Sequence, residues 1–417
     1  MKRIMAALAL VVTLTSGLAL TAFAQEKGEI EVLLDGLPVQ FDVQPLIKGD
    51  RTLVPFRAVA DALNVVVHWD GAKRTITAQD GENSVWMQID NKVAYRNEAP
   101  ITLDVPPEII GNRTVIPLRF FSEALNCKVA WNGSLRRVSI ASSPRELAVI
   151  GFYALGDSAT SSWTDLFGQV FPDHAIGNTD IVDEVAAGWY AIDVEGNLLT
   201  SSRTGWQRPA GWESVLATAE QYELGTEMVV HEVNWDRMLD KLLADDTAVA
   251  QMVDQITAEA AEHYTGVNLD LEGLGLSATA EELLQIQSNF TKMATLLAES
   301  LHKAGLSLTL TLHAPNSAYK GYDYRALGQI ADRIIIMAYG YGSRPEPTAL
   351  VVQAVGQALQ EVAPEKLSLG VSLPSENPTS ILTKVGIAKR YKLQGIALWR
   401  LGLVQEEVWQ ALRTTIK

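Results

Sequence analysis

The chain has 417 residues, and its 34 Lys and Arg against 49 Asp and Glu give a formal charge of −15. At roughly 100–200 residues per domain this length predicts two or three domains, and a hydrophobic fraction of 47% excludes global disorder. The acidic balance argues against nucleic-acid binding, which needs a basic surface, and the single cysteine, Cys127, excludes an internal disulfide and a cysteine-rich zinc site.

Residues 1–24 have the features of an export signal. Lys2 and Arg3 form a positive start, an apolar stretch runs from Ile4 to Leu20, and Ala22-Phe23-Ala24 provides a small-x-small cleavage site. An uncleaved membrane anchor is the alternative, but the apolar stretch is short for a span of about 20 residues. We therefore expect a protein that is secreted or associated with the cell wall, without stable membrane insertion after cleavage.

An internal repeat organises residues 30–141. The segment Arg51-Thr52-Leu53-Val54-Pro55-Phe56-Arg57 aligns without a gap with Arg113-Thr114-Val115-Ile116-Pro117-Leu118-Arg119, an offset of 62 residues. Each copy predicts a strand, a short helix (56–63 and 118–125) and a hairpin that turns at Asp-Gly or Asn-Gly. Trp69 and Trp131 are equivalent in the repeat, which favours paired core residues over a sugar platform. The sequence predicts a small duplicated α+β domain.

These repeated elements resemble the copper amine oxidase N-terminal-like, or stalk, domain of exported bacterial proteins. The resemblance implies an accessory or wall-associated role, and the ligand is not readable from the residues. His68 is the only histidine of the region. We expect it in a strand beside Trp69 rather than as a copper ligand. A polar linker is predicted at 142–146.

After residue 146, short apolar runs alternate with longer helical patterns, which is typical of βα units around a parallel sheet. Eight strands are expected, the number of a (β/α)8 TIM barrel of ordinary size. They are Leu147–Tyr153, Ile181–Ala191, Glu227–Glu232, Gly266–Glu272, Leu306–Leu312, Arg333–Tyr339, Lys366–Leu373 and Gly395–Leu398. An amphipathic helix over 280–304 is predicted to start at a capping box of Thr279 and Glu282. We therefore expect an α/β fold with a TIM barrel over 147–417, because an open doubly wound sheet would need a Gly-rich phosphate loop after its first strand.

The candidate chemistry lies on the fourth strand, Gly266–Glu272. Because side chains alternate along a strand, Asn268, Asp270 and Glu272 share one face, which we expect to face the lumen. Buried carboxylates are costly, and barrel enzymes hold their catalytic groups at the C-terminal ends of strands. The pattern predicts a catalytic carboxylate pair; a solvated strand end with incidental acids is the alternative.

At these residues the chain resembles glycoside hydrolase family 18, and within it the branch of spore-germination and cortex-lytic N-acetylglucosaminidases, whose fourth strand often reads G-V-N-I-D-F-E. The segment 331–339 resembles the approach to the sixth strand and the M-x-Y motif of this family, and Gly395–Trp399 resembles its eighth strand. The resemblance implies cleavage of β-linked N-acetylglucosamine polymers, chitin or peptidoglycan. The acetamido oxygen of the substrate would be the nucleophile, and no cofactor or metal is expected.

The resemblance also implies roles for individual residues. Glu272 would protonate the glycosidic oxygen, and Asp270 would orient the acetamido group and help Glu272 to stay protonated. Tyr339 would donate a hydrogen bond to the acetamido carbonyl, and Trp399 would form the floor under the −1 sugar. Further substrate-binding residues are expected at Asn268, Met337, Tyr153, Trp189 and Asn234.

One position departs from the family pattern. Gly340 stands where the family usually has Asp or Glu after the tyrosine, so a catalytically weak or lectin-like glycan-binding protein is the alternative function. A carboxylate restored at this position is expected to raise the pKa of Glu272 and increase turnover, provided that the backbone angle allows a side chain. His231 ends the third strand, where a core or rim role is as compatible with the pattern as contact with sugar.

Overall fold

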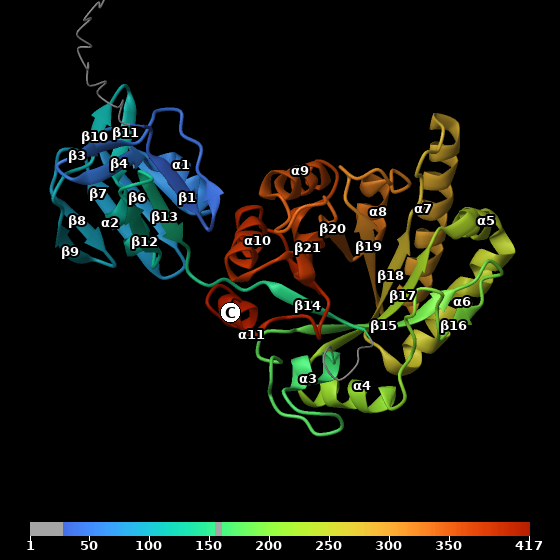
Figure 1. The fold of residues 1–417 in the computed structure, drawn as a ribbon. Helices are drawn as coiled ribbons and strands as arrows, with labels where there is room; N and C mark the ends of the chain where they lie inside the picture. Colours follow the sequence, from blue (N-terminus) through green and yellow to red (C-terminus); the bar gives the residue numbers. More distant parts are fainter. Residues whose placement is uncertain (1–27, 155–160) are drawn as a thin grey trace, which may run out of the picture.

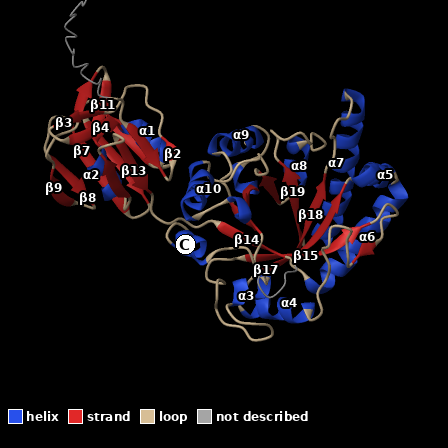
Figure 2. Cartoon of the chain, viewed as in Figure 1, coloured by secondary structure: helices blue, strands red, loops and turns tan. Residues whose placement is uncertain are grey.

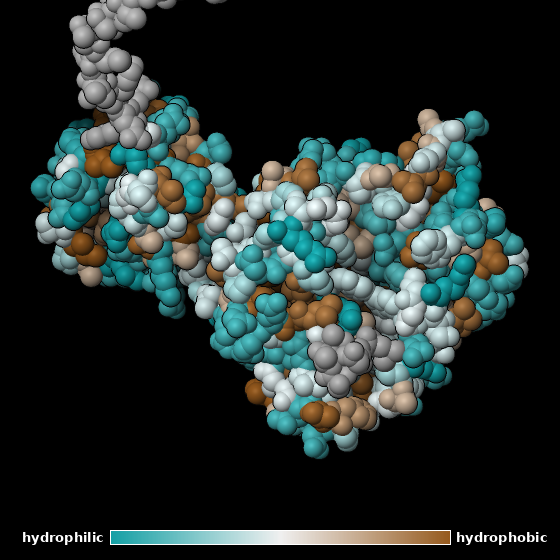
Figure 3. Space-filling model, in the orientation of Figure 1, coloured by the Kyte–Doolittle hydropathy of each residue, from teal (hydrophilic) through white to brown (hydrophobic). Residues whose placement is uncertain are grey.

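The computed structural model describes residues 28–154 and 161–417, so the predicted export signal lies outside the described residues. Figure 1 shows a β-rich N-terminal module followed by a larger barrel ringed by helices, and Figure 2 separates the helices and strands of both parts. Over these two ranges, no helix is both long and apolar enough to cross a membrane. The face drawn in Figure 3 is mostly hydrophilic, with apolar side chains in small groups.

The N-terminal module confirms the predicted helices and hairpins of both repeats. Its described strands form sheets of order β12-β13-β1-β2, β10-β11-β4-β3 and β5-β6-β7-β8-β9. The elements are β1 (Glu31–Leu34), β2 (Leu37–Pro38), β3 (Leu46–Lys48), β4 (Arg51–Pro55), α1 (Phe56–Ala62), β5 (Val66–Asp70), β6 (Thr75–Asp80), β7 (Asn83–Gln88), β8 (Val93–Arg96), β9 (Ala99–Thr102), β10 (Glu108–Ile110), β11 (Arg113–Pro117), α2 (Leu118–Ala124), β12 (Lys128–Asn132) and β13 (Arg137–Ala141).

Each of these sheets combines strands from both repeats. β13 of the second copy pairs in parallel with β1 of the first, and β4 of the first copy pairs antiparallel with β11 of the second. The hairpin β5-β6 continues through β7 into β8 and β9. Because the two copies share one hydrophobic core, neither copy is a folding unit by itself.

The barrel is closed by pairing of its first parallel strand with both the second and the last. All eight predicted strands are confirmed, with ends shifted by up to three residues, and a two-residue strand, β16 (Leu198–Leu199), extends β15 as a hairpin. The eight are β14 (Ala148–Tyr153), β15 (Glu184–Ile192), β17 (Gly225–Val233), β18 (Gly266–Glu272), β19 (Ser307–His313), β20 (Arg333–Met337), β21 (Leu367–Ser372) and β22 (Gly395–Trp399).

Helices cover the outside of this barrel (Figure 2). The longest, α7, begins at Thr279, whose side chain forms the predicted capping box with Glu282. The α-helices are α3 (Ser162–Phe167), α4 (Trp212–Gln221), α5 (Met238–Ala244), α6 (Asp246–His263), α7 (Ala280–Lys303), α8 (Tyr324–Ile330), α9 (Thr348–Ala358), α10 (Pro378–Arg390) and α11 (Glu406–Arg413), and the 3-10 turns are η1 (Trp235–Arg237), η2 (Pro364–Lys366) and η3 (Leu373–Ser375).

The side chains of β18 alternate between the core and the lumen as the sequence predicts. Val267, Leu269 and Leu271 are buried in the large core between strands and helices. The opposite face points into the lumen, where Asn268 donates to Glu227 at 2.9 Å and accepts from Thr311 at 2.7 Å. These hydrogen bonds satisfy the polar groups of the lumen below the level of the carboxylate pair.

The N-terminal module rests on α10 of the barrel. Asn64 donates to the carbonyl oxygens of Lys389 and Arg390, and Leu37 is part of the barrel's own core cluster. The buried Lys389 ammonium donates to Ser142 and to the Ser143 carbonyl, each at 3.1 Å, and to Thr415 at 2.7 Å. The linker residues therefore belong structurally to the barrel's end as well as to the module.

Candidate active site

A cavity of about 550 Å³ lies at the C-terminal ends of the barrel strands. It contains five of the nine predicted site residues, Asp270, Glu272, Met337, Tyr339 and Trp399. The remaining lining residues are Phe152, Thr311, His313, Ala314, Asn316, Ser317, Ala318, Tyr319, Gly340 and Tyr341. Strands β14, β18, β19, β20 and β22 all contribute to its wall, as expected for a barrel site.

The two carboxylates of β18 differ sharply in their surroundings. Asp270 is 3% exposed, and its Oδ1 is buried without a hydrogen-bond partner. The side chain of Glu272 is 28% exposed and lies between two imidazoles, with 3.2 Å from Oε1 to Nε2 of His231 and 3.3 Å from Oε2 to Nε2 of His313. The inner carboxyl is thus free to meet a ligand, and the outer one is clamped.

Both imidazoles are fixed by aromatic rings. The ring of His313, at the end of β19, stacks on Tyr319 with centroids 4.0 Å apart. His231, at the end of β17, stacks on Trp206 at 4.8 Å, and its Nδ1 lies 3.4 Å from the Thr204 hydroxyl. Each histidine therefore has a defined orientation toward Glu272.

These contacts place the proton of the carboxylate pair on Asp270. Burial, together with the charge of Glu272, raises the pKa of Asp270 to about 8, and the charge of His231 opposes this rise. Burial also acts to raise the pKa of Glu272, but the hydrogen bond from His231 and the charges of His313 and His231 outweigh it, so that this pKa is lowered. The prediction that the pair would keep Glu272 protonated is therefore wrong for the free site; the flanking histidines reverse the order.

The pKa values of the two histidines are shifted in opposite directions. Burial disfavours the charged form of His231, yet its hydrogen bond to Glu272 and the charges of Asp270, Glu272 and Glu232 raise its pKa. For His313, burial dominates over the charge of Glu272 and lowers the pKa. The site thus favours an imidazolium at His231, beside an ionised Glu272.

Trp206 reaches the barrel mouth from the loop that follows β16. Its ring stacks on Trp399 at 4.9 Å and on His231 at 4.8 Å, so the indole lies between the end of β22 and the end of β17. Gly188 on β15 provides the space, because a Cβ there would lie 1.9 Å from the Trp206 ring. One face of the predicted sugar floor is therefore already covered by protein.

The remaining wall is formed by Tyr339 and Met337 at the end of β20. Gly370 on β21 leaves room for the Tyr339 ring, since a Cβ there would lie 3.2 Å from it. Burial and the charges of Asp270 and Glu272 raise the pKa of Tyr339 well above its usual value. Its hydroxyl is consequently held as a hydrogen-bond donor beside the carboxylates.

Two predicted binding residues face the wrong side of their strands. Trp189 is fully buried and makes ring contacts with Tyr153 and Trp212, in the core between the strands and α4. Tyr153 is buried in the same cluster. The residues that point inward are their neighbours, Phe152, which contacts Trp399 edge to face, and Gly188. The prediction of sugar contacts for Tyr153 and Trp189 is wrong.

The side-chain amides of two predicted binding residues, Asn268 and Asn234, are hydrogen-bonded within the protein. Asn268 is fully buried, one layer below Asp270, and its amide is used by Glu227 and Thr311. Asn234 donates to Asp240 at 3.0 Å and accepts from the Leu239 amide at 2.9 Å, where the chain enters α5. Neither lines the cavity, so the predicted substrate contacts of both residues are not supported.

Gly340 adopts a backbone that suits glycine. Its φ is +80°, in the left-handed region, although a Cβ would meet nothing within 4 Å. The buried carboxylate of Glu346 accepts from the backbone amides of Gly340 and Tyr341, at 3.0 and 3.1 Å. The backbone angle at position 340 therefore does not favour a side chain, and a carboxylate placed there is not expected to increase turnover.

His231, Asp270 and Glu272 are the three described groups whose ligand atoms could hold a metal ion, all within 4.8 Å of one another. The direct contact between His231 and Glu272 engages two of these atoms with each other. Sequence reasoning noted His231 without assigning it and missed His313, Tyr319 and Phe152. Both histidines lie at the end of a predicted strand, and these two strands are the neighbours of β18 in the barrel. This position is the signal that could have revealed them.

The N-terminal module and the barrel match different groups of known proteins. Residues 33–140 match the copper amine oxidase N-terminal domain family, which confirms the resemblance predicted for that segment. Among curated relatives, a protein named as a sporulation-specific glycosylase, YdhD of Bacillus subtilis, is 26% identical over 215 residues, which cover 49% of this chain and 44% of YdhD. The cortical fragment-lytic enzyme of the same organism is 26% identical over 145 residues, or 32% of each chain. This chain thus spans less than half the length of these two relatives.

Solved structures share the barrel. A chitinase from Chromobacterium violaceum superposes with a TM-score of 0.53 and 18% identity, covering 64% of this chain and 98% of the chitinase. The spore cortex-lytic enzyme SleL of Bacillus megaterium superposes with a TM-score of 0.54 and 15% identity, covering 66% of this chain and 75% of SleL. At these identities the likeness shows the fold, and the relatives by sequence are named glycosylases and a lytic enzyme.

Proposed function

We propose that this chain is an exported glycoside hydrolase that cleaves β-linked N-acetylglucosamine polymers, chitin or peptidoglycan, by substrate-assisted retaining catalysis. The observation that carries the proposal is that a buried Asp270, whose Oδ1 has no hydrogen-bond partner, and a more exposed Glu272 line one cavity beside Tyr339. The names of the similar proteins support a glycan substrate.

The proposed first step uses one proton and the substrate's own acetamido group. The acetamido oxygen attacks the anomeric carbon while Glu272 gives a proton to the leaving glycosidic oxygen, and a cyclic oxazolinium intermediate forms. Asp270 accepts the acetamido N–H through its free oxygen, and the Tyr339 hydroxyl donates to the acetamido carbonyl. Glu272 then takes a proton from the water that opens the ring.

The free site requires a proton transfer before this step. Asp270 holds the proton in the free site, and the ligand atoms of Asp270 and Glu272 lie within 4.8 Å of each other. When the acetamido N–H needs an acceptor, the proton on Asp270 is the one available to Glu272. The pair therefore acts as a unit that holds one proton.

The test is hydrolysis of chitooligosaccharides and purified peptidoglycan, with the products read by mass. Glu272→Gln should keep glycan binding and lose turnover by about 10²–10⁴, the usual contribution of a general acid. A chelator should leave the rate unchanged. Wild-type turnover in Glu272→Gln would contradict the role of this acid, and loss of activity with EDTA would point to a metal at the His231 trio instead.

A glycan-binding protein without turnover is the second candidate. The clamp of Glu272 between two histidines and the Trp206 ring on Trp399 favour it. If the wild-type chain binds one of these glycans and cleaves none, the binding function replaces the enzyme.

A further inference from the structure

The two repeats of the N-terminal module are related by an approximate two-fold axis. In the β4–β11 ladder Val54 faces Ile116, its equivalent in the other copy, and the pairs on either side exchange positions. An ion pair is duplicated in the same way, because Arg51 binds Asp104 and Arg113 binds Asp42, residues that are also 62 positions apart. Each pair joins one copy to the other.

The two equivalent surfaces have diverged. Trp69 and Phe41 are half-buried, and each packs against the module's core. At the equivalent positions of the other surface, Trp131 is 40% exposed and the smaller, buried Leu103 replaces the phenyl ring. The duplication therefore produced one surface with a half-buried indole beside a phenyl position and one where the indole is more exposed and leucine replaces the phenyl ring.

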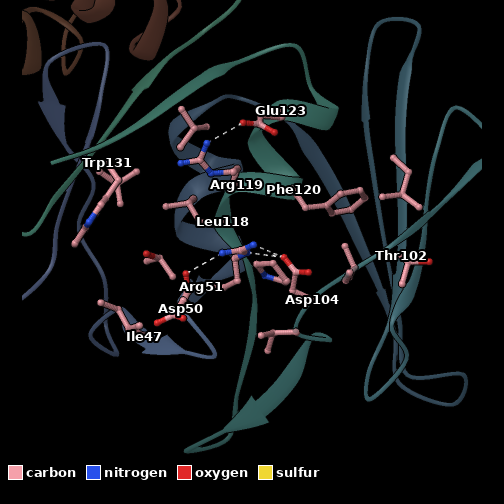
Figure 4. A pocket seen from close by; sticks show the side chains of 17 residues that line it. Ile47, Asp50, Arg51, Thr102, Asp104, Leu118, Arg119, Phe120, Glu123 and Trp131 are labelled. Carbon is pink, nitrogen blue, oxygen red and sulfur yellow. Dashed lines mark hydrogen bonds and ion pairs between the residues drawn. The ribbon is translucent and has the colours of Figure 1, made fainter. Parts of the chain in front are cut away.

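The exposed indole of Trp131 borders a cleft of about 680 Å³ (Figure 4). The turn before β4, the segment after β9, helix α2 and the hairpin β12-β13 surround it. Leu118 and Val138, both buried, form part of an apolar floor. The volume is within the roughly 300–1,000 Å³ of small-ligand sites.

The rim of the cleft carries planar polar groups. Figure 4 shows Arg51 paired with Asp104 and Arg119 paired with Glu123, and the pairs measure 2.5 and 3.5 Å. All four side chains are about half exposed or more. Such exposed pairs contribute little to stability, so their hydrogen bonds can be exchanged with a ligand at small cost.

This combination of groups fits a neutral, polyhydroxylated ligand. Guanidinium and carboxylate groups bind neighbouring hydroxyls in pairs, and an exposed indole packs on the C–H face of a sugar ring. With Asp50 also at the rim, two basic and three acidic side chains leave the cleft nearly neutral, which does not select a polyanion. An apolar floor beside these groups suits the alternating faces of a glycan.

We propose that the cleft between Trp131 and Arg119 is an accessory glycan-binding site that holds a short stretch of a β-linked N-acetylglucosamine polymer. The identity of the glycan rests on the function proposed for the barrel. The site lies in a different module from the carboxylate pair, so it adds retention on the polymer without taking part in bond cleavage.

The experiment measures retention of the full chain on insoluble chitin and on purified peptidoglycan. Glu272→Gln is present throughout to prevent turnover, and Trp399→Ala is added in parallel to separate binding by the barrel. Trp131→Ala and Arg119→Ala should each weaken retention by about tenfold or more, as for truncated anchors at other interfaces. The repeat supplies a matched control, Arg57→Ala, which removes the exposed arginine equivalent to Arg119, and Tyr95→Ala removes an aromatic of similar exposure outside the cleft.

Soluble chitooligosaccharide should compete for this retention, and in the active chain Trp131→Ala should leave its hydrolysis unchanged. Retention that does not depend on Trp131, in a chain that cleaves glycan, overturns the cleft and leaves the barrel's function intact. Retention that depends on Trp131 in a chain that cleaves nothing supports the cleft and removes the enzyme. Competition by a free stem peptide, but not by chitooligosaccharide, overturns the glycan assignment in favour of a peptide site.

Discussion

Replacing His231 with glutamine should move the alkaline limit of activity to higher pH. Glutamine keeps an N–H donor near Glu272 and removes the imidazolium charge. The ligand atoms of His231, Asp270 and Glu272 lie within 4.8 Å, where two unit charges interact by roughly 3.5 kcal/mol at an effective dielectric constant of 20. At 1.36 kcal/mol per pKa unit this corresponds to about 2.5 units for charges at that separation.

The sign follows from the charge. A nearby cation stabilises the ionised carboxylates, so its removal raises the pKa of both Asp270 and Glu272. The pair then keeps its proton to higher pH. In the wild type, activity should fall as pH rises through about 8, where Asp270 loses that proton. Because the two carboxylates and His231 titrate as one coupled group, we expect a shift of about 1–2 units in the alkaline limb.

The assay is kcat/KM against pH on whichever soluble glycan the wild type cleaves. The plateau should fall by less than about tenfold, in contrast to the loss in Glu272→Gln, because the hydrogen bond to Glu272 is kept. His302→Gln is the control, since His302 pairs with Asp332 on the surface and not with the carboxylates. An alkaline limb that stays in place or moves to lower pH refutes the electrostatic argument.

Two further predictions concern the backbone and the module boundary. Gly340→Ala should lower the free energy of unfolding by about 1–2 kcal/mol, because φ is +80°. The control is Gly356→Ala inside α9, which should be neutral or stabilising because nothing lies within 4 Å of its Cβ position. Equal free energies of unfolding for both variants in denaturant titrations would contradict the backbone strain at Gly340. The melting temperature of a fragment 147–417 should be roughly 2–8 °C below that of a fragment 142–417. The reason is that the buried Lys389 loses its hydrogen bonds to Ser142 and Ser143, at a cost of about 1–3 kcal/mol. Calorimetry of the two fragments measures the difference, and identical melting temperatures would place the domain boundary at residue 147.

The parts of the fold that the sequence predicts are those with a local signal. The repeat, the hairpin turns, the capping box of Thr279 and the alternation of β18 all follow from residues close in the chain. The polar residues on β18 also reveal which of its faces points inward. The carboxylate pair in the lumen was therefore predictable from one strand.

The errors arise where a strand is apolar on both faces. β14 and β15 are buried throughout, so the pattern gives no sign that Phe152 and Gly188 face the lumen while Tyr153 and Trp189 face the helices. A glycine within a strand often marks close approach of another group, and at Gly188 that group is Trp206. The prediction that Trp131 is a core residue is wrong, because this residue is 40% exposed. The reason differs from that for β14 and β15: the two repeats exchange strands, so the surroundings of Trp131 come from both copies.

The electrostatics around Glu272 point in one direction at positions 340 and 231. A carboxylate at position 340 would favour a protonated Glu272, and glycine removes that influence. His231 adds positive charge beside the same carboxylate and lowers its pKa further. The absence of an acid at position 340 and the charge of His231 thus both favour the ionised form of Glu272, and the only raised pKa of the carboxylate pair is that of the buried Asp270. Catalysis in this barrel should accordingly depend on the proton stored at Asp270, and the loss of that proton above about pH 8 sets the limit that His231→Gln is expected to move.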